Sequence, residues 1–597
     1  MISVPNCYCK AKGMFLCYHR RVCMDDIDLI GRKHAGGMTM YTDGKIRIGM
    51  KEDGENIYIN PSMSCRHGLI AGATGSGKTI TLKVLAESFS EMGVPVFLAD
   101  VKGDLAGMCM PGTDSEDMQR RIEKFRLSGA GFEYHGYPTV FWDIYGRKGT
   151  PLRTTISEMG PDLMSAVLGL NDLQTALMSI IYKIADDQGL LLIDTKDLKA
   201  ILNYVSENHK VFEEEYGKIA PVSIAAIVRE VVALEMKGAE QFFGEPAINI
   251  RDFFSTGPEG RGVINILDSS SLINDPTLYS MFMLYLLSEL FETLPEVGDQ
   301  AKPKLVFFFD EAHLLFSGAS KDLLIKIEQV VKLIRSKGVG VYFATQNPSD
   351  IPDGVMNQLG NKIEHALHAY TPAEQKKVKA AAEGLRANPD FNTYETLMAL
   401  GTGEAVVSFL GEDGVPGLAQ KVSILPPQSQ MGEISDATRE SEIKSSVIYT
   451  KYAESYDPES AYEFLKRKGV EDEEAKAAAE KAAADEKEAL KAQQAAEKEA
   501  QRAQAQAEKE AQRAQERVER EAQKAKEKAE REAEREKERE SRKVKTAAKS
   551  VGNSVAGTVG REVGKSVGSS FGKFGKTLGG NVGASIGRGI IGTLFKL

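Results

Sequence analysis

The chain has 597 residues, more than one ordinary domain, so two or more structural units are expected. Its composition, 42% hydrophobic and 27% charged, is typical of a soluble protein. The net charge of −10 argues against a generally basic nucleic-acid-binding surface, although it leaves room for a basic channel. No apolar run approaches the roughly 20 residues of a membrane-spanning helix, and we find no apolar segment of a secretory signal. We therefore expect a cytoplasmic protein.

Residues 1–37 differ from the rest of the chain. They are rich in cysteine, show no clear periodicity and end in a glycine pair before Met38. A pattern of short β-strands begins at Met40 and includes residues 56–60. One hypothesis is that translation of the native protein begins at Met38 or Met40, so that residues 1–37 are a leader that is not translated natively. The intact mass of the native protein tests this hypothesis.

A glycine-rich segment follows a short apolar strand at residues 68–71 and precedes a helical pattern that starts near Thr81. Strand, glycine loop and helix in this order are what a phosphate-binding P-loop requires. The glycines let backbone N–H groups surround phosphate oxygens, and the helix N-terminus adds partial positive charge. Lys78 can reach the β- and γ-phosphates of ATP, and the Thr79 hydroxyl can ligate Mg²⁺. The predicted nucleotide-binding residues of this segment are Gly72, Ala73, Thr74, Gly75, Ser76, Gly77, Lys78 and Thr79.

A buried strand is predicted at residues 94–99, directly before Asp100. Because ligands bind beyond the carboxyl ends of parallel strands in open α/β sheets, Asp100 is a further candidate for nucleotide binding. Asp104 fits a solvated turn equally well. Amphipathic patterns then predict a helical insertion at about 150–260, and a strongly apolar helix at 276–294.

The apolar strand at residues 305–309 runs directly into Asp310 and Glu311. Downstream of a P-loop, Asp310 can hold the magnesium ion through water, and Glu311 can polarise the attacking water as a general base. The next strand ends at Gln346, whose polar side chain can sense the γ-phosphate. Arg335 is far enough along the chain to serve a neighbouring subunit, where an arginine can be worth about 10³–10⁵ in rate. A charge on a surface helix is the alternative for Arg335.

These motifs resemble those of the HerA/FtsK superfamily of ring ATPases. The resemblance is carried by residues 72–79, Asp100-Val101-Lys102-Gly103-Asp104, Asp310-Glu311-Ala312-His313, Arg335 and Ala344-Thr345-Gln346-Asn347-Pro348. A bacterial HerA-like group of the YjgR type is closer still, on residues 66–69, 371–391, 425–432 and 587–592. The resemblance implies an α/β fold with a RecA-like P-loop NTPase core at 38–460, a hexameric ring and DNA translocation. HerA itself works with a nuclease, so a nuclease partner is implied too. The region before Arg66 is too short for the full β-barrel of HerA proteins.

Residues 471–545 consist almost entirely of Ala, Glu, Lys, Gln and Arg, and the sequence at 496–504 recurs at 507–515. An 11-residue period fits a straight or slightly right-handed helix. Large hydrophobic residues are almost absent, which favours a solvated helical spacer over a coiled coil, with helix association through alanine as the alternative. Residues 546–597 are glycine-rich and basic. They fit either a flexible tail or a peripheral contact with a membrane or another tail.

Two functional hypotheses follow from the sequence. The first is Mg²⁺-dependent ATP hydrolysis by a HerA-like ring ATPase, coupled to DNA translocation or remodelling, with Glu311, Lys78, Gln346 and Arg335 as catalytic residues. The second is an ATP-switched assembly or scaffold protein that acts through its helical and glycine-rich tail at a membrane or protein partner. A small-molecule kinase is a weaker third hypothesis, which the helical insertion and the Asp-Glu pair argue against. Stimulation of ATP hydrolysis by DNA separates the first hypothesis from the second.

Overall fold

The computed structural model describes residues 40–42, 44–317 and 319–537. The chain divides into two compact units between Ala477 and Ala478. The first unit contains a large β-sheet with its covering helices and the start of one long helix, and the described part of the second is the remainder of that helix. The predicted leader at 1–37 and the predicted glycine-rich tail at 546–597 lie outside the described residues.

One mixed sheet runs through the first unit, with 13 strands among the described residues. Its spatial order is β1 (Tyr41–Thr42), β2 (Lys45–Met50), β13 (Gln420–Ile424), β12 (Glu404–Ser408), β11 (Asn361–His365), β4 (Gly68–Ala71), β10 (Val339–Thr345), β9 (Leu305–Phe309), β5 (Val96–Asp100), β8 (Ile264–Asp268), β6 (Thr139–Asp143) and β7 (Thr150–Pro151), while β3 (Asn56–Ile59) pairs with β2. From β11 to β7 all neighbours run parallel. The remaining pairs run antiparallel.

The parallel half of the sheet has the strand order of a RecA-like core. The P-loop strand β4 lies between β11 and β10, and β9 and β5 follow on the β10 side. This arrangement confirms the predicted α/β fold class. Because parallel strands point the same way, the residues that follow β4, β5, β9 and β10 all leave the sheet at its carboxyl edge. Gly72, Asp310 and Gln346 are therefore brought to one edge although they are far apart in the sequence.

Helices cover both faces of the sheet. The helices of the described residues are α1 (Lys78–Glu91), α2 (Glu116–Lys124), α3 (Ile156–Val167), α4 (Asp172–Asp187), α5 (Thr195–Glu207), α6 (His209–Tyr216), α7 (Pro221–Met236), α8 (Pro276–Thr293), α9 (His313–Ser317), α10 (Lys321–Ile334), α11 (Asp353–Met356), α12 (Pro372–Glu383), α13 (Thr393–Ala399), α14 (Asp436–Ser445), α15 (Val447–Tyr452) and α16 (Ala461–Lys537). In β9, Phe308 packs against Phe89 of α1, whereas Phe307 and Phe309 share the other core with α8 and α10. Burial on two faces explains why this strand is apolar at every position.

The helices α3 to α7 follow one another between β7 and β8, in the region where the sequence predicts a helical insertion. They share a hydrophobic core that includes Ile181, Ile201 and Ile227, each fully buried. Helix α4 begins with a capping box in which Asn171 and Gln174 bond to each other's backbone N–H groups. The amphipathic pattern in the sequence therefore reflects helices that pack against one another.

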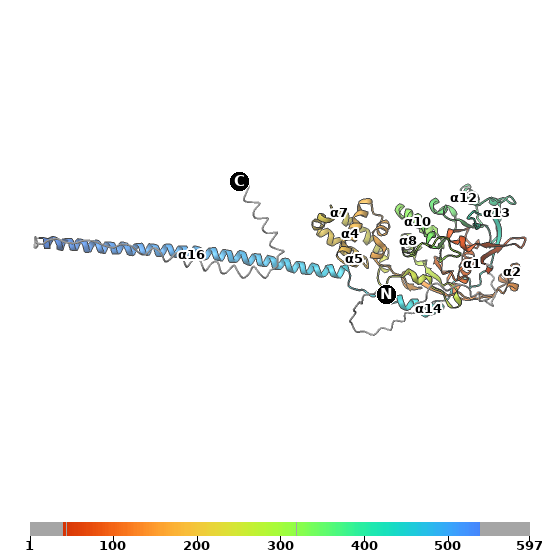
Figure 1. The fold of residues 1–597 in the computed structure, drawn as a ribbon, viewed down its shortest axis with the longest axis horizontal. Coiled ribbons are helices and arrows are strands. Elements are labelled where there is room, and N and C mark those ends of the chain that lie inside the picture. Colours follow the sequence, from red (N-terminus) through yellow and green to blue (C-terminus); the bar gives the residue numbers. More distant parts are fainter. Residues whose placement is uncertain (1–39, 43, 318, 538–597) are drawn as a thin grey trace, which may run out of the picture. The chain divides into compact units, whose positions relative to one another are not determined.

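Helix α16 is the long helix of Figure 1 and begins at Ala461, before the predicted range 471–545. Its start is fixed by packing, because Ala461 is fully buried and the Asp197 carboxylate of α5 accepts hydrogen bonds from Ser460 Oγ (2.6 Å) and Tyr462 N (2.8 Å). Beyond Ala477 the described side chains are exposed. None of the described helices combines enough length with enough apolar character to cross a bilayer.

Candidate nucleotide-binding site

The loop between β4 and α1 needs glycine for both its backbone and its packing. Gly72, Gly75 and Gly77 have φ angles of 153°, 77° and 115°, a region that favours glycine. A Cβ atom on Gly72 would lie 2.5 Å from the Cβ of His365. Helix α1 begins at Lys78 without a side-chain cap, so its first N–H groups remain available to phosphate oxygens.

Lys78 lies inside this loop and is only 6% exposed. Its Nζ donates hydrogen bonds to the carbonyl oxygens of Gly72 (2.7 Å) and Ala73 (3.0 Å), partners that phosphate oxygens can replace. Burial lowers the pKa of Lys78, while the negative charge of Glu311 works in the opposite direction. The buried Ser76 hydroxyl has no hydrogen-bond partner and is a further polar atom that fits a bound phosphate.

Three carboxylates converge beyond β5 and β9. Asp100, Asp104 and Asp310 each place an oxygen within 4.8 Å of the others. Asp310 is 2% exposed, and its Oδ2, like Asp104 Oδ1, is buried without a hydrogen-bond partner. Hard oxygen ligands with unsatisfied buried charge fit a divalent cation such as Mg²⁺. Thr79, the other predicted magnesium ligand, lies beside Asp104.

The same crowding changes the protonation of two of these carboxyl groups. Burial is the main cause that raises the pKa of Asp100 to about 7, and the neighbouring Asp104 adds to it. Burial likewise raises the pKa of Asp310 to about 7, with a further contribution from Glu311. Asp100 is held in place by the N–H groups of Gly103 (2.7 Å) and Leu105 (3.0 Å). A bound cation would favour the charged forms and return both pKa values towards their ordinary range.

Glu311 is linked to the P-loop through Gln346. The Nε2 atom of Gln346 donates to both Glu311 oxygens (3.1 and 3.3 Å), and its Oε1 accepts from Thr74 Oγ1 (3.2 Å). His313 Nδ1 lies 3.3 Å from Glu311 Oε2, and Lys102 Nζ contacts Oε1. Burial alone would raise the pKa of Glu311, but the hydrogen bonds from Lys102 and Gln346 outweigh it and hold the pKa below its ordinary value. Glu311 is thus charged and 4% exposed, with its backbone in the left-handed region at φ 46°.

A buried histidine supports the P-loop from the neighbouring strand. His365, the last residue of β11, places Nε2 2.8 Å from Thr81 Oγ1 and Nδ1 2.9 Å from the carbonyl oxygen of Glu404. Burial lowers the pKa of His365 to about 4, so the ring is neutral at pH 7. In the tautomer that fits, Nδ1–H donates to the carbonyl and Nε2 accepts from the threonine. His365 therefore positions α1 and the Gly72 turn against β11.

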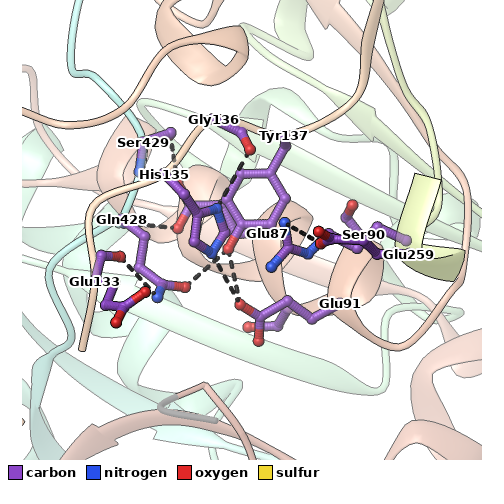
Figure 2. Close-up of polar contacts among 12 residues, drawn as sticks. Glu87, Ser90, Glu91, Glu133, His135, Gly136, Tyr137, Glu259, Gln428 and Ser429 are labelled. Atoms are coloured by element: carbon purple, nitrogen blue, oxygen red, sulfur yellow. Dashed lines mark hydrogen bonds and ion pairs between the residues drawn. The ribbon is translucent and has the colours of Figure 1, made fainter. Parts of the chain in front are cut away.

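Helix α1 is also held by residues 425–432, which we call the strap. Glu87 is fully buried on α1, and its carboxylate accepts hydrogen bonds from Gln428 N (2.9 Å), Ser429 N (3.1 Å) and the Ser429 hydroxyl. Figure 2 shows Gln428 and Ser429 lying against Glu87. The residues that carried part of the resemblance at 425–432 thus contact the helix that follows the P-loop.

Two further polar contacts fix the strap. Lys83, also buried on α1, donates from Nζ to the carbonyl oxygen of Gln430 (2.6 Å). The Tyr137 hydroxyl lies 2.8 Å from Gln428 Oε1 and 3.0 Å from Glu91 Oε1, as Figure 2 shows. Because Lys83 and Glu87 both bond to the strap and Glu91 bonds to Tyr137 beside it, α1 is held in a defined orientation.

Arg335 stands apart from the other predicted site residues. It lies in the short 3₁₀ turn Arg335–Lys337, at the amino end of β10, whereas Gln346 follows the carboxyl end of the same strand. Its side chain is 43% exposed and lies 3.6 Å from Asp299. The structure therefore gathers the predicted P-loop residues with Asp100, Asp310, Glu311 and Gln346, and places Arg335 at the opposite edge of the sheet.

The sequence did not single out Lys102, His313 or His365 as site residues. Lys102 and His313 belong to the motifs around Asp100 and Asp310, and their nearness to those acids was the available signal. His365 carried no local signal, because its role depends on β11 lying beside β4.

The fold and this site define the class of protein. A phosphate-binding glycine loop faces a buried acidic pair across the carboxyl edge of a RecA-like sheet, which is the arrangement of a P-loop ATPase. Comparison with known protein families identifies one family within this class. The family described as Helicase HerA-like C-terminal matches residues 45–496, and the chain belongs to this family.

Individual relatives are more distant. The chain is 23% identical over 380 residues to the DNA double-strand break repair helicase HerA of Sulfurisphaera tokodaii, covering 62% of this chain and 68% of that protein. It is 22% identical over 426 residues to the protein of the same name from Saccharolobus solfataricus, covering 68% and 75% of the two chains.

Solved structures that match the chain include the plasmid coupling protein TrwB in complex with ADP and Mg²⁺, with a TM-score of 0.43 and 15% identity over 63% of this chain and 88% of that one. VirB4 of Thermoanaerobacter pseudethanolicus has a TM-score of 0.41 and 15% identity, covering 65% of this chain and 98% of that one.

Proposed function

We propose that this protein hydrolyses ATP with Mg²⁺ and couples hydrolysis to movement or remodelling of DNA. Lys78 and the N–H groups of the P-loop hold the phosphates, and Thr79 and Asp310 hold the metal. When bound, Mg²⁺ supplies positive charge to the β- and γ-phosphates. Glu311 orients and polarises the attacking water, and Gln346 contacts the γ-phosphate.

The observation that carries this proposal is the hydrogen-bonded connection from Thr74 through Gln346 to Glu311. A glutamate with a purely structural role would not need a hydrogen-bonded connection to the P-loop. Here the residue expected to sense the γ-phosphate bonds to the P-loop with one end and to the water-orienting carboxylate with the other. The unsatisfied Asp310 oxygen beside it supports metal-dependent hydrolysis.

The coupling to DNA rests on the family and on the named relatives, which are DNA double-strand break repair helicases. We further propose a hexameric ring in which Arg335 completes the site of a neighbouring subunit. The exposure of Arg335 at the far edge of the sheet supports a role outside its own chain. A nuclease partner remains a prediction from the resemblance to HerA.

The decisive experiment measures ATP hydrolysis with Mg²⁺, alone and with single- or double-stranded DNA. We expect DNA to stimulate turnover. Glu311→Gln should keep ATP binding and lower kcat by about 10²–10⁴-fold, the usual contribution of a general base. Glu230→Gln, on the exposed side of α7, is the control and should hydrolyse ATP normally. Normal turnover by Glu311→Gln would remove its proposed role.

The second hypothesis, an ATP-switched assembly or scaffold protein, is favoured by one feature, the exposed helix α16. A helix of 77 residues spans on the order of 100 Å and can present a long surface to a partner. ATP hydrolysis that is indifferent to DNA, together with partner recovery that depends on α16, would support it over a DNA motor.

A further inference from the structure

Lys102 has no role in the proposed steps of hydrolysis, yet it contacts Glu311, the residue proposed to polarise the attacking water. It lies just beyond β5, and its Nζ contacts Oε1 of Glu311, just beyond β9. Because β5 and β9 are adjacent and parallel, both residues leave the same edge of the sheet. The Lys102 side chain is 40% exposed and that of Glu311 is 5% exposed. A long, solvent-accessible lysine side chain thus forms an ion pair with a buried carboxylate.

This contact is incompatible with the task proposed for Glu311. A general base must present an oxygen to the water that it polarises. Oε1 already accepts from Lys102 and Gln346, and Oε2 lies against Gln346 and His313. The ammonium group also stabilises the charged carboxylate and makes it a weaker base. Glu311 therefore needs to lose this partner before it can act on water.

The surroundings of Lys102 offer its ammonium group a second partner. Burial lowers the pKa of Lys102, but the hydrogen bond to Glu311 and the charges of Asp310 and Asp104 outweigh it, so the side chain is charged. Gln346 joins Glu311 to Thr74 of the P-loop, so the γ-phosphate of an ATP in that loop would lie close to the Lys102–Glu311 contact. A γ-phosphate carries more negative charge than one carboxylate, and a four-carbon stem lets lysine follow it.

We propose that Lys102 exchanges partners during the ATPase cycle. It holds Glu311 while the site lacks a γ-phosphate, and it moves to the γ-phosphate of bound ATP, which frees Glu311 to orient water. After hydrolysis and loss of phosphate, Lys102 returns to Glu311. Lys102 is thus both a γ-phosphate ligand and a positioning residue for Glu311. This inference rests on the proposed ATPase function.

The first test compares the binding of ATPγS and ADP, each with Mg²⁺, by calorimetry. We expect Lys102→Ala to weaken ATPγS binding about tenfold and to change ADP binding less than twofold, because only ATPγS carries a group at the γ position. Lys102→Arg keeps the charge and should retain most of the preference for ATPγS. The matched control is Lys199→Ala, which breaks a similarly half-buried pair with Glu235 (2.6 Å) in the helical insertion and should change neither constant. Equal weakening of both nucleotides by Lys102→Ala, or no weakening, overturns the proposal.

The second test separates a moving lysine from a static one by comparing KM and kcat for ATP. If Lys102 has left Glu311 for the γ-phosphate in the ATP complex, Lys102→Ala should raise KM about tenfold and change kcat less than twofold, because it removes an interaction made equally in the bound substrate and in the transition state. A change in kcat with KM unaltered would mean that the Lys102–Glu311 pair persists through turnover, which overturns the exchange.

Failure of this inference is distinguishable from failure of the proposed function. If the wild-type protein neither binds nor hydrolyses ATP, the ATPase proposal itself is wrong. If the wild-type protein is active and the Lys102 variants have the same preference for ATPγS over ADP as the wild type, only the proposed exchange of partners by Lys102 is wrong. Should Lys102→Ala not fold, Lys102→Gln removes the charge with less loss of volume and is compared in the same way.

Discussion

The attachment of the strap to α1 allows a quantitative prediction of stability. Glu87→Ala removes the acceptor of three hydrogen bonds, from Gln428 N, Ser429 N and the Ser429 hydroxyl. Each buried donor left unpaired costs about 1 kcal/mol or more. The buried Lys83 also loses the negative charge that most offsets its burial. The three unpaired donors give an expected loss of about 3 kcal/mol in the free energy of unfolding of the first unit.

Equilibrium unfolding in urea measures this loss through Trp142, the one tryptophan of the chain. Trp142 is fully buried in β6 and donates from Nε1 to Asn265 Oδ1 (3.0 Å), so its fluorescence reports the integrity of the sheet. Ser429→Ala removes one hydrogen bond to a charged group and should cost about 1.5–3 kcal/mol. Ser445→Ala, an exposed position on α14, is the control and should stay within about 0.5 kcal/mol of the wild type. A Glu87→Ala protein as stable as that control would refute the reasoning.

Three other outcomes are expected. His365→Ala should weaken ATPγS binding about tenfold, measured by calorimetry, because the hydrogen bond from Thr81 to His365 that holds α1 beside the P-loop is lost. Unchanged binding would mean that His365 contributes only to packing. In EDTA, the melting temperature should fall between pH 5.5 and pH 8, and it should fall more for the wild type than for Asp310→Asn. The reason is that the pKa of Asp310 is raised from 3.8 to about 7 in the folded protein, so this carboxyl group stabilises the fold at low pH and loses that contribution as the pH rises through 7. Equal falls for the two proteins would contradict the raised pKa. Arg335→Ala should be nearly inactive alone, and mixing it with the inactive Glu311→Gln should restore part of the hydrolysis, because some sites then receive both residues; mixtures without activity would argue against a role in trans.

The parts of the site that the sequence predicted are those with a local signature. Strand β4 ends at Ala71, and strand β9 ends one residue before Asp310, as the apolar runs indicate. A buried strand must be apolar along its length and must stop where polar residues reach the sheet edge. The residues that follow such strands are therefore recognisable without knowledge of the tertiary fold.

The parts that the sequence did not predict depend on which strands become neighbours. His365 supports the P-loop only because β11 pairs with β4, and Lys102 reaches Glu311 only because β5 pairs with β9. The anchoring of Glu87 by the strap requires contact between segments more than 300 residues apart. Glu87 itself fits the polar side of an amphipathic helix, and no periodicity marks it as fully buried. The burial of Glu87 can be recognised only when the position of the strap is known.

The position of Arg335 restricts the kind of assembly in which it can act. Strand β10 lies between Arg335 and Gln346. Its seven residues extend over roughly 23 Å at about 3.3 Å per residue, a distance that an arginine side chain does not span. Arg335 can therefore contact a γ-phosphate only if the amino edge of one sheet meets the carboxyl edge of another. A head-to-tail interface needs one edge from each subunit, and closes into a ring when its rotation permits. A two-fold dimer would need both edges within one self-complementary patch. If Arg335 acts in trans, the geometry of the sheet thus favours a ring over a two-fold dimer.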